Sequence, residues 1–500
     1  MRPTLVFPRL GALLAGVAAG LALSTVEAAP APRTEAVEST IRDEIGAGKL
    51  ASLTFALVQD GRILREGGFG MADPGRHLAA TAHTPYPLAS LTKPLVATAT
   101  MSLVERGKID LEAPAARYLP EAGQDVPGNI RQLLGHTSGL TTYVRIGWGG
   151  NSPGVPDAGA DPWPYAFAAQ PPGTLFEYAN LGYGLLGRIV EARSGQSLGG
   201  FLRSDLFVPL GMHDSSLPGR FQVPARAARK LDATGKPLPP TWNDTPGAGN
   251  AYASAHDLAL FATFSMSSAP SKVLGPDNRR LMREHVEPGA RHDYYAGAHY
   301  GLGWYFRDEP SGERVVWHEG GMPGASSIVY MLPGRNLAVA VLINQTDANE
   351  AAQRFALALV HAVEPRFTGT PLVATQGFER YAGAEDLRGR WSGLIHVAGS
   401  LAPWSLTFRD DGLLEAELPA SPGVAPRKET FRAQVHEGLV LGAFEGGLSG
   451  DGETAGPGRY VLLRLLRQGD QITGALVAYS SEERLEYLRP YAVSLRRESR

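Results

Sequence analysis

The feature that most constrains the fold is a change in the pattern of apolar residues near residue 365. From about residue 35 to that point, runs of helical and of strand periodicity are mixed. Beyond it, short apolar runs are separated by Gly, Asp or Glu, which is typical of a β-barrel or β-sandwich of about eight strands. We therefore predict an α+β domain over 35–365, a linker over 366–378 and an all-β domain over 379–500.

Residues 1–29 are predicted to be a secretory signal peptide. Arg2 and Arg9 give a positive start, and Val26 and Ala28 form a small-x-small cleavage site after an apolar run. A membrane anchor is the alternative, but the run has only about 15 residues where a span needs about 20. We expect a periplasmic or secreted protein that keeps no stable membrane span once the signal is removed.

The composition excludes several classes of function. The 500 residues contain no cysteine, which rules out disulfides, thiol catalysis and cysteine-ligated metals. The formal net charge of −3 gives no footprint for nucleic acid. The sequence has no dense His/Asp cluster and no H-E-x-x-H motif. The run that begins with His318 and Glu319 has Met322 where the second histidine of that motif would stand. We expect no metal, no cofactor and a small-molecule or peptide substrate, with the oligomeric state left open.

The first domain has clear signals for individual elements. Asp60-Gly61, inside an apolar run over 53–70, predicts a β-hairpin. Glycines, capping residues and apolar periodicity predict the remaining helices and strands. Helices are expected over 90–106, 182–195, 254–264 and 348–363, and antiparallel strands over 300–306, 314–318, 326–332 and 337–344.

Two motifs match known patterns but fail on chemistry. "GYGLLG" (182–187) matches G-x-G-x-x-G, but no continuous apolar strand precedes it, so close helix packing is the better interpretation than dinucleotide binding. "GNSPG" (150–154) matches G-x-S-x-G, where the residue after the serine must donate its backbone N–H to an oxyanion. That residue is Pro153, which has no N–H, so Ser152 is excluded as a nucleophile.

The segment "ASLTKPL" (89–95) carries the strongest candidate nucleophile. On a helix, Ser90 and Lys93 share one face, and the helix N-terminus favours developing negative charge. Lys93 would then be close enough to take or modulate the serine proton. The alternative is an N-cap serine followed by a solvated lysine, because S-x-x-K alone is common.

Three further motifs follow in order: "LLGHTSGL" (133–140), "PPGTLFEYAN" (171–180) and "HEGGMPG" (318–324). Together with Ser-x-x-Lys, they resemble the serine β-lactamase and penicillin-binding-protein-like family, particularly its class C β-lactamase-related and esterase-like branch. The resemblance covers about residues 35 to 365. It implies an antiparallel sheet flanked by helices plus a helical lobe, and the C-terminal region is similar to the lipocalin-like barrels appended to some members.

The resemblance implies that Ser90 is the nucleophile of an acyl-enzyme and that Tyr178 is the general base or shares that task with Lys93. Tyrosine titrates near 10 and lysine near 10.4, so neither is a ready base at neutral pH. Lowering either pKa by three units requires about 4 kcal/mol, which suits a buried site. The sequence leaves open which of the two residues is the main base.

The remaining motif residues are assigned to substrate binding. If its segment is extended, Asn180 faces the same side as Tyr178, where its amide could hold Lys93 and a substrate carbonyl; an Asx-turn is the alternative. The resemblance places His318 and Gly320 beside the nucleophile, on an edge strand. It makes the backbone N–H groups of Ser90 and Gly321 the oxyanion hole, where one donor is typically worth about 2.7–4 kcal/mol.

Two residues near these motifs need separate interpretations. His136, with Ser138 and Gly139, is expected to end a helix and brace the site rather than take part in the reaction. Glu319 stands where β-lactamases and D,D-peptidases typically carry Thr or Ser. If its side chain faces the site, it should disfavour anionic substrates such as β-lactams; if it faces away, it is irrelevant.

These expectations describe an exported serine hydrolase that acts through an acyl-enzyme on ester or amide substrates, in the manner of an esterase or D-aminopeptidase. One alternative is a β-lactamase or D-Ala-D-Ala carboxypeptidase. The other, from a different class, is a non-catalytic penicillin-binding-like receptor, against which the complete set of motifs argues.

Overall fold

The computed structural model describes most of the chain. The expected signal peptide, Ser152 and residues 373–377 of the expected linker lie outside the described residues. Within the described part, no helix is both long and apolar enough to cross a membrane. The described ranges are 33–119, 126–148, 163–285, 287–291, 297–372, 378–397, 400–418, 427–445, 448, 460–482 and 485–498.

An eight-stranded antiparallel sheet forms the framework of the first domain. The predicted hairpin lies within it, and its turn residues Asp60 and Gly61 have φ of 50° and 74°, the left-handed geometry of tight hairpin turns. The strands follow the order β3 (Leu78–Ala79), β2 (Arg62–Asp73), β1 (Ser52–Gln59), β12 (Leu337–Ile343), β11 (Ala325–Leu332), β10 (Arg314–Met322), β9 (Tyr305–Asp308) and β8 (His299–Tyr300).

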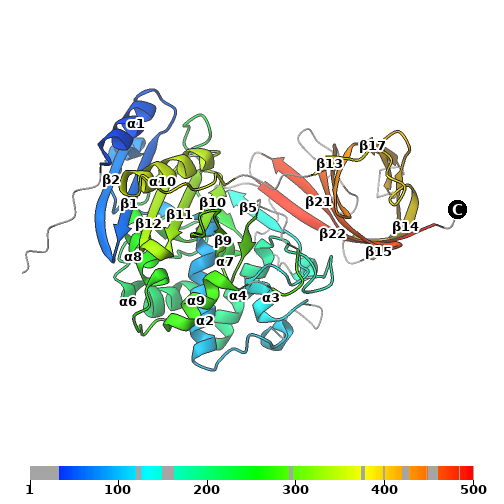
Figure 1. The fold of residues 1–500 in the computed structure, drawn as a ribbon, viewed down its shortest axis with the longest axis horizontal. Helices are drawn as coiled ribbons and strands as arrows, with labels where there is room; N and C mark the ends of the chain where they lie inside the picture. Colours follow the sequence, from blue (N-terminus) through cyan, green and yellow to red (C-terminus); the bar gives the residue numbers. More distant parts are fainter. Residues whose placement is uncertain are drawn as a thin grey trace, which may run out of the picture.

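The two faces of this sheet are covered by different helices (Figure 1). Helices α1 (Glu35–Gly46) and α10 (Asn349–Val363) cover one face, whereas α8 (Ala255–Met266) and a helical lobe cover the other. Because side chains alternate along a strand, Trp317 packs in the core under α10 while Val316 packs in the core under the lobe. The same alternation decides which β10 residues face the lobe.

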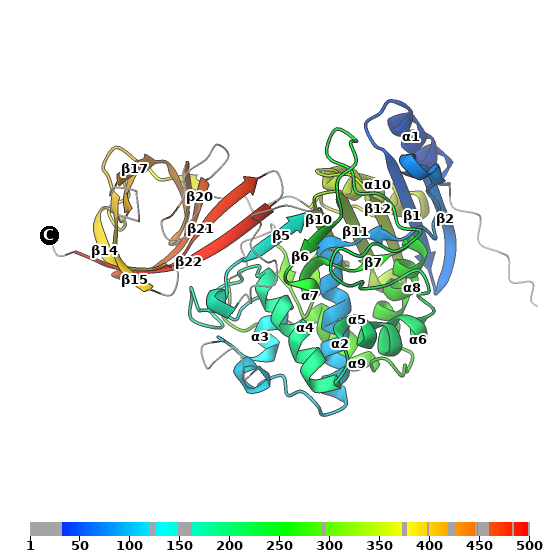
Figure 2. The ribbon, with the colours of Figure 1, turned by 180° about the vertical axis from the view of Figure 1, so that it is seen from behind.

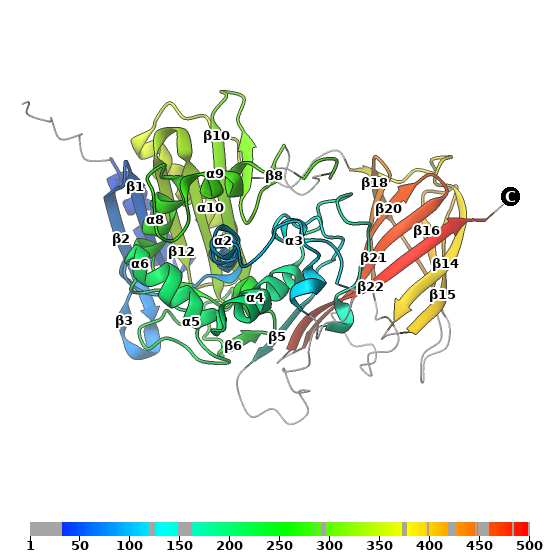
Figure 3. The ribbon, with the colours of Figure 1, turned by 90° about the horizontal axis from the view of Figure 1, so that it is seen from below.

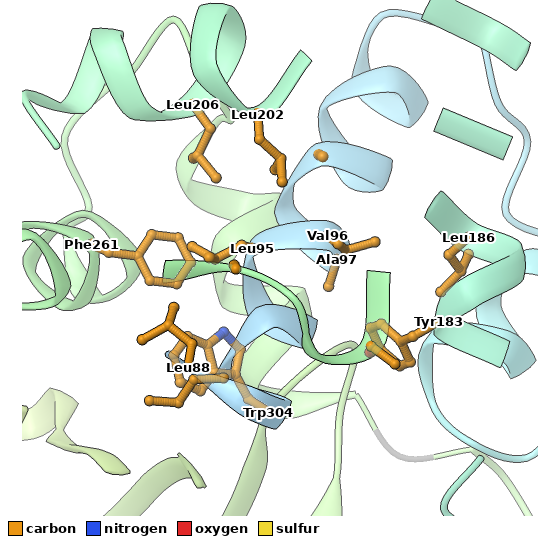
Figure 4. Close-up of a cluster of buried hydrophobic side chains, with 14 of the residues drawn as sticks. Leu88, Leu95, Val96, Ala97, Tyr183, Leu186, Leu202, Leu206, Phe261 and Trp304 are labelled. Atoms are coloured by element: carbon orange, nitrogen blue, oxygen red, sulfur yellow. The ribbon is translucent and has the colours of Figure 1, made fainter. Parts of the chain in front are cut away.

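Helix α2 (Thr92–Glu105) runs through the middle of the lobe, and Figure 3 shows it almost end-on. Its first twelve residues are all buried, and apolar side chains from several other elements pack around it (Figure 4). The domain also contains β4 (Tyr86–Pro87), β7 (Tyr252–Ala253), α3 (Ile130–Leu134), α4 (Asn180–Ser194), α5 (Leu198–Leu202), a π-helical turn (Arg203–Phe207), α6 (Val208–Leu210), α7 (Pro246–Gly249) and α9 (Pro276–Glu284).

The predicted helices and strands of this domain are confirmed, with one difference. The run 300–306 is two short strands, β8 and β9, rather than one. Gly301 N donates a hydrogen bond to the carbonyl of Trp304 at 2.7 Å, which closes a turn between them. Gly303 has a φ of 99° and lies against α2, where a Cβ would be 2.6 Å from that of Ala97. The turn therefore needs glycine, and apolar content alone could not show it.

The described residues between 379 and 497 form an all-β domain whose antiparallel strands curl into an open barrel (Figure 1). Strand β17 returns to contact β19 although the two are not paired. The predicted all-β class is confirmed. The strands are β13 (Glu379–Arg380), β14 (Gly389–Val397), β15 (Ser400–Phe408), β16 (Leu414–Leu418), β17 (Arg427–Phe431), β18 (Ala433–His436), β19 (Leu439–Glu445), β20 (Tyr460–Gln468), β21 (Gln471–Glu482) and β22 (Leu485–Arg497).

The two domains share one sheet, which the sequence did not predict. Strand β5 (Val144–Trp148) of the first domain pairs with the start of β22, and β6 (Thr241–Asn243) pairs with β5. The hairpin of β21 and β22 extends from the barrel towards β5 (Figure 2). In the described part of the linker, Phe367 and Leu372 are buried against the first domain. The barrel is therefore joined to the lobe through backbone hydrogen bonds.

Candidate active site

Ser90 lies in a short 3-10 turn, Ala89–Leu91, that leads directly into α2. Ala89 has a φ of 47°, a sparsely populated conformation for a residue with a side chain and one that functional sites often retain. The turn is held in place because Ser327 Oγ donates to the carbonyl of Leu88 at 3.0 Å. The half-buried Ser90 is thus presented at the start of a rigid helix, as its motif predicted.

Lys93 is completely buried, with 0% of its surface exposed. Its Nζ lies 3.0 Å from Ser90 Oγ, 2.7 Å from Asn180 Oδ1 and 3.0 Å from the carbonyl oxygen of Ala248. None of these partners is a carboxylate, so burial is uncompensated and holds the pKa of Lys93 well below its usual range. The arrangement therefore favours a neutral amine beside the serine hydroxyl.

Tyr178 brings the second predicted motif to the same nitrogen. The centre of its ring lies 4.6 Å from Lys93 Nζ, and that of Tyr183 lies 5.8 Å from it. Asn180, two residues after Tyr178, starts α4 and supplies the carbonyl oxygen that Lys93 contacts. Ser90, Lys93, Tyr178 and Asn180 are therefore brought together by one amine, although they are up to 90 positions apart in the sequence.

His136 supports this arrangement from behind. It follows α3 with a φ of 58° and is buried. Its Nδ1 accepts a hydrogen bond from the backbone N–H of Ala179 at 3.1 Å, and its carbonyl accepts one from Glu177 at 2.8 Å. Its ring centre lies 4.4 Å from that of Tyr178. His136 thus holds the Tyr-x-Asn segment on both sides of Tyr178, as expected of a bracing residue.

The second half of β10 lies beside Ser90. Among the described residues, β9 pairs only with residues 314–317 of this strand, which leaves that edge without a strand partner over residues 318–322. A Cβ on Gly320 would lie 3.0 Å from Ser90 N and 2.1 Å from the carbonyl oxygen of Leu88, so only glycine permits this approach. Gly321, the next residue, is exposed. This placement is compatible with a pair of backbone donors around one oxygen atom.

His318 lines the buried wall of the site and is 1% exposed. Its Nδ1 donates to its neighbour's carbonyl, that of Glu319, at 2.7 Å, which leaves Nε2 to accept from the hydroxyl of Tyr300 at 3.0 Å. Burial lowers the pKa of His318 to about 3. The side chain is therefore neutral at physiological pH and acts as a fixed hydrogen-bonding wall rather than as a cation.

Glu319 faces away from the nucleophile. It follows Trp317 on the α10 side of the sheet, and its Oε2 accepts a hydrogen bond from Gln353 Nε2 of α10 at 2.6 Å. Of the two orientations that the sequence allowed, the structure has the one in which this charge does not face the site. Glu319 therefore gives no reason to expect discrimination against anionic substrates.

The barrel contacts the Tyr-x-Asn segment directly, and no sequence pattern indicated this. Arg464 of β20 forms an ion pair with Glu177, and its Nη2 donates to the carbonyl of Phe176 at 3.2 Å. Nearby, the side chains of Gln170 and Thr473 are hydrogen-bonded at 2.7 Å. These contacts hold the stretch that leads into Tyr178. They could not be found from sequence, because the partners are 288 and 303 positions apart and lie in different domains.

A sheet with helices on both faces, and a Ser-x-x-Lys turn facing a Tyr-x-Asn segment, are the features of a serine hydrolase. The family described as Beta-lactamase matches residues 37–363. The chain belongs to this family, as its motifs suggested, and is a serine hydrolase.

Individual proteins show the same relationship. Penicillin-binding protein 4 of Amycolatopsis lactamdurans is 31% identical over 303 residues, which cover 56% of this chain and 77% of that protein. The crystal structure of SurE superimposes with a TM-score of 0.63 at 24% identity, covering 93% of this chain and 98% of SurE. The D-amino acid amidase of Ochrobactrum anthropi SV3, crystallised with L-phenylalanine amide, has a TM-score of 0.54 at 22% identity, covering 66% of this chain and 99% of the amidase.

Proposed function

We propose that the protein is an exported hydrolase in which Ser90 attacks the carbonyl of an ester or amide and forms an acyl-enzyme. The observation that carries this proposal is the contact of Ser90 Oγ with the Nζ of a completely buried lysine. The apolar N-terminal segment, with its small-x-small site, supports export.

The hydrogen bonds of Lys93 support its role as the first proton acceptor. A neutral amine has two N–H groups and one lone pair. The oxygens of Asn180 and Ala248 can only accept, so they take both N–H groups. The lone pair is then left for the hydroxyl proton of Ser90, 3.0 Å away. In this assignment Asn180 orients the base as well as the substrate.

The other residues of the site complete the reaction. Tyr178, whose ring lies over the same nitrogen, passes the proton from Lys93 to the leaving group. The backbone N–H groups of Ser90 and Gly321 stabilise the oxyanion, as donors of this kind do in acyl transfer. Water then attacks the acyl-enzyme with the same groups acting in reverse. His318 and Gly320 form the wall along which the substrate lies.

Small amides and esters of amino acids are the substrates we favour. The D-amino acid amidase, and SurE, which has been crystallised with D-Leu, share this fold. The orientation of Glu319 towards α10 removes the objection to a second candidate, a β-lactamase or D-Ala-D-Ala carboxypeptidase, because no glutamate charge at this position opposes a substrate carboxylate. The relationship to penicillin-binding protein 4 points in the same direction.

A labelling experiment tests the nucleophile. We expect a fluorophosphonate probe to label the wild type and Ser204→Ala, a control at an exposed serine of the lobe, but not Ser90→Ala. A panel of esters, D-aminoacyl amides, β-lactams and D-Ala-D-Ala peptides then ranks the substrates by kcat/KM. Labelling that persists in Ser90→Ala would refute the assignment. A folded wild type that takes no label would instead support the receptor alternative.

A further inference from the structure

A second group of chemically active side chains lies far from Ser90. Glu66 of β2, His83 of the loop before β4 and His256 in the first turn of α8 each offer one potential ligand atom, and these atoms lie within 4.8 Å of one another. Strand β2 is four positions from β10 in the sheet order, so the group is separate from the catalytic residues. Nothing in the proposed reaction uses it.

The hydrogen bond of His83 aims one ring nitrogen at this group. Its Nδ1 lies 3.0 Å from Asp214 Oδ2, and because a carboxylate only accepts, Nδ1 carries the proton. The lone pair of Nε2 then faces Glu66 Oε1 at 3.7 Å. A carboxylate that fixes the tautomer of a histidine in this way is the usual outer partner of a metal-bound imidazole.

His256 contacts the other oxygen of the same carboxylate. Its Nδ1 lies 2.8 Å from Glu66 Oε2, and the centres of the two imidazole rings are 4.3 Å apart. A neutral His256 donates its Nδ1 proton to Glu66, whereas the Nε2 lone pair of His83 and Glu66 Oε1 face each other with no proton between them. A divalent cation bound by both would satisfy these two atoms, and His256 would join them by exchanging its Nδ1 proton for the same ion.

The surrounding backbone holds these residues in place. The N–H of His256 donates to the carbonyl of Ala82 at 3.1 Å, which joins α8 to the loop of His83. Asp257, which is buried, accepts from the N–H of Asp214 at 2.8 Å and so fixes the loop that carries that carboxylate. A ligand at this position would therefore connect four segments of the chain that already touch.

We propose that Glu66, His83 and His256 form a binding site for a transition-metal dication of the Zn²⁺ type, with Asp214 orienting His83. Two imidazole nitrogens and a carboxylate are ligands that Zn²⁺ accepts, at about 2.0–2.2 Å from the metal. The 3.7 Å between His83 Nε2 and Glu66 Oε1 leaves room for an ion between them. The exposed side of His83 leaves the fourth position to water. The ion joins β2, α8 and two loops and has no part in the reaction.

The test measures metal binding rather than activity. Untagged full-length protein is stripped with a chelator and titrated with ZnCl₂ by calorimetry, and with CoCl₂ by visible absorption. We expect one ion per chain, a d–d spectrum typical of four-coordinate Co²⁺ and an increase in the unfolding temperature with Zn²⁺. His83→Ala and Glu66→Gln should weaken the affinity at least 100-fold, and Asp214→Asn by 10- to 100-fold, the range for outer-shell partners.

His77→Ala is the matched control, because His77 is an exposed histidine of the same region. It should bind Zn²⁺ like the wild type, and the esterase rate of every folded variant should be unchanged. Equal affinity of the wild type and Glu66→Gln, or no saturable binding by the wild type at 100 µM, would overturn the proposal. Circular dichroism of each stripped variant separates loss of the site from loss of the fold.

Discussion

Replacement of Arg464 by methionine should damage the active site from outside the catalytic domain. Arg464 lies on β20 of the barrel, where it pairs with Glu177 and donates to the carbonyl of Phe176. Both partners directly precede Tyr178. Methionine keeps much of the apolar bulk of the side chain but removes the charge and all of its donors. Glu177 is then left against the barrel without its cation.

The loss in the free energy of unfolding on removal of this ion pair should lie between two limits. The side chains of Arg464 and Glu177 are 21% and 15% exposed to solvent, so the pair is neither at the surface nor fully buried. Exposed pairs contribute about 0–1 kcal/mol, whereas removal of one partner from a buried pair costs about 3–5 kcal/mol. We expect Arg464→Met to lower the free energy of unfolding by about 2 kcal/mol. A displaced Tyr178 should lower kcat about 10-fold, because small misplacements of catalytic groups have large effects.

The same strand supplies a matched control. Arg467 also lies on β20, but it pairs at 2.9 Å with the exposed Asp386 of the same domain. Arg467→Met should therefore leave kcat close to that of the wild type. Chemical unfolding and ester hydrolysis of both variants, with Glu177→Gln and the double variant Arg464→Met/Glu177→Gln, form a double-mutant cycle. We expect a coupling energy of about 1–2 kcal/mol between Arg464 and Glu177.

The pH dependence gives a readout that a general loss of packing would not produce. Burial raises the pKa of Glu177 while Arg464 opposes that rise, so removal of Arg464 should raise this pKa further. At low pH the carboxyl becomes neutral and no longer needs a cation. The stability deficit of Arg464→Met should therefore be larger at pH 8 than at pH 5. A deficit independent of pH, or equal kcat in Arg464→Met and Arg467→Met, would refute the reasoning.

Three further predictions concern β10. Gly320→Ala would place a Cβ 2.1 Å from the carbonyl oxygen of Leu88, so the strand must move; we expect a loss of about 1–3 kcal/mol in stability from overpacking and about 100-fold in kcat/KM. Burial lowers the pKa of His318 to about 3, so between pH 6.5 and 3 this histidine is protonated only in the unfolded chain. Its contribution to the free energy of unfolding should therefore fall by about 1.4 kcal/mol for each unit by which the pH is lowered across that window. In His318→Asn, chemical unfolding at several pH values should show a smaller dependence of stability on pH. Glu319→Gln should leave the ratio of nitrocefin to p-nitrophenyl ester turnover unchanged, because Glu319 faces Gln353.

The features that were predicted correctly from the sequence are those that depend on residues close together in the chain. Asp60-Gly61 specified its hairpin because its left-handed turn favours those residue types. Ser90 and Lys93 were placed correctly because three residues along a helix are always neighbours. The positions of Tyr178 and Asn180 beside that pair were predicted from the order of several motifs in a known family. Local physical rules alone could not predict them.

The rest depends on contacts between residues distant in sequence. Glu66, His83 and His256 are separated by up to 190 positions, and no local pattern joins them into one group. The pairing of β5 with β22 crosses a domain boundary, and the apolar run that contains β5 is too short to identify its partner strand. The orientation of Glu319 could be narrowed to two faces, but only the position of α10 decided between them. The alternation of side chains along a strand limits a residue to one of two faces but does not say which face is buried against a given helix.

The neutrality of Lys93 is the physical condition on which the proposed reaction depends. Its pKa is lowered by burial and not by a neighbouring cation, so a carboxylate placed at its side should restore the charge. Asn180→Asp is nearly isosteric and adds a negative charge at the atom that now accepts from Nζ at 2.7 Å. An opposite charge at this range raises the pKa of a lysine by about one to three units. The acid limb of the kcat/KM profile should therefore move to higher pH by a similar amount.

Asn180→Ala separates this charge effect from the loss of a hydrogen bond. It removes the acceptor without adding a charge, so kcat/KM should fall while the acid limb stays in place or moves to lower pH. If Lys93 instead works as a permanent ammonium beside a tyrosinate, its protonation state cannot respond to the added carboxylate. In that case the added carboxylate would act on Tyr178 and move the acid limb in the same direction. Profiles of the wild type and both variants between pH 5 and 10 therefore separate the effect of the charge on the base from the loss of the hydrogen bond, and an acid limb that Asn180→Asp leaves in place would refute a titrating base beside residue 180.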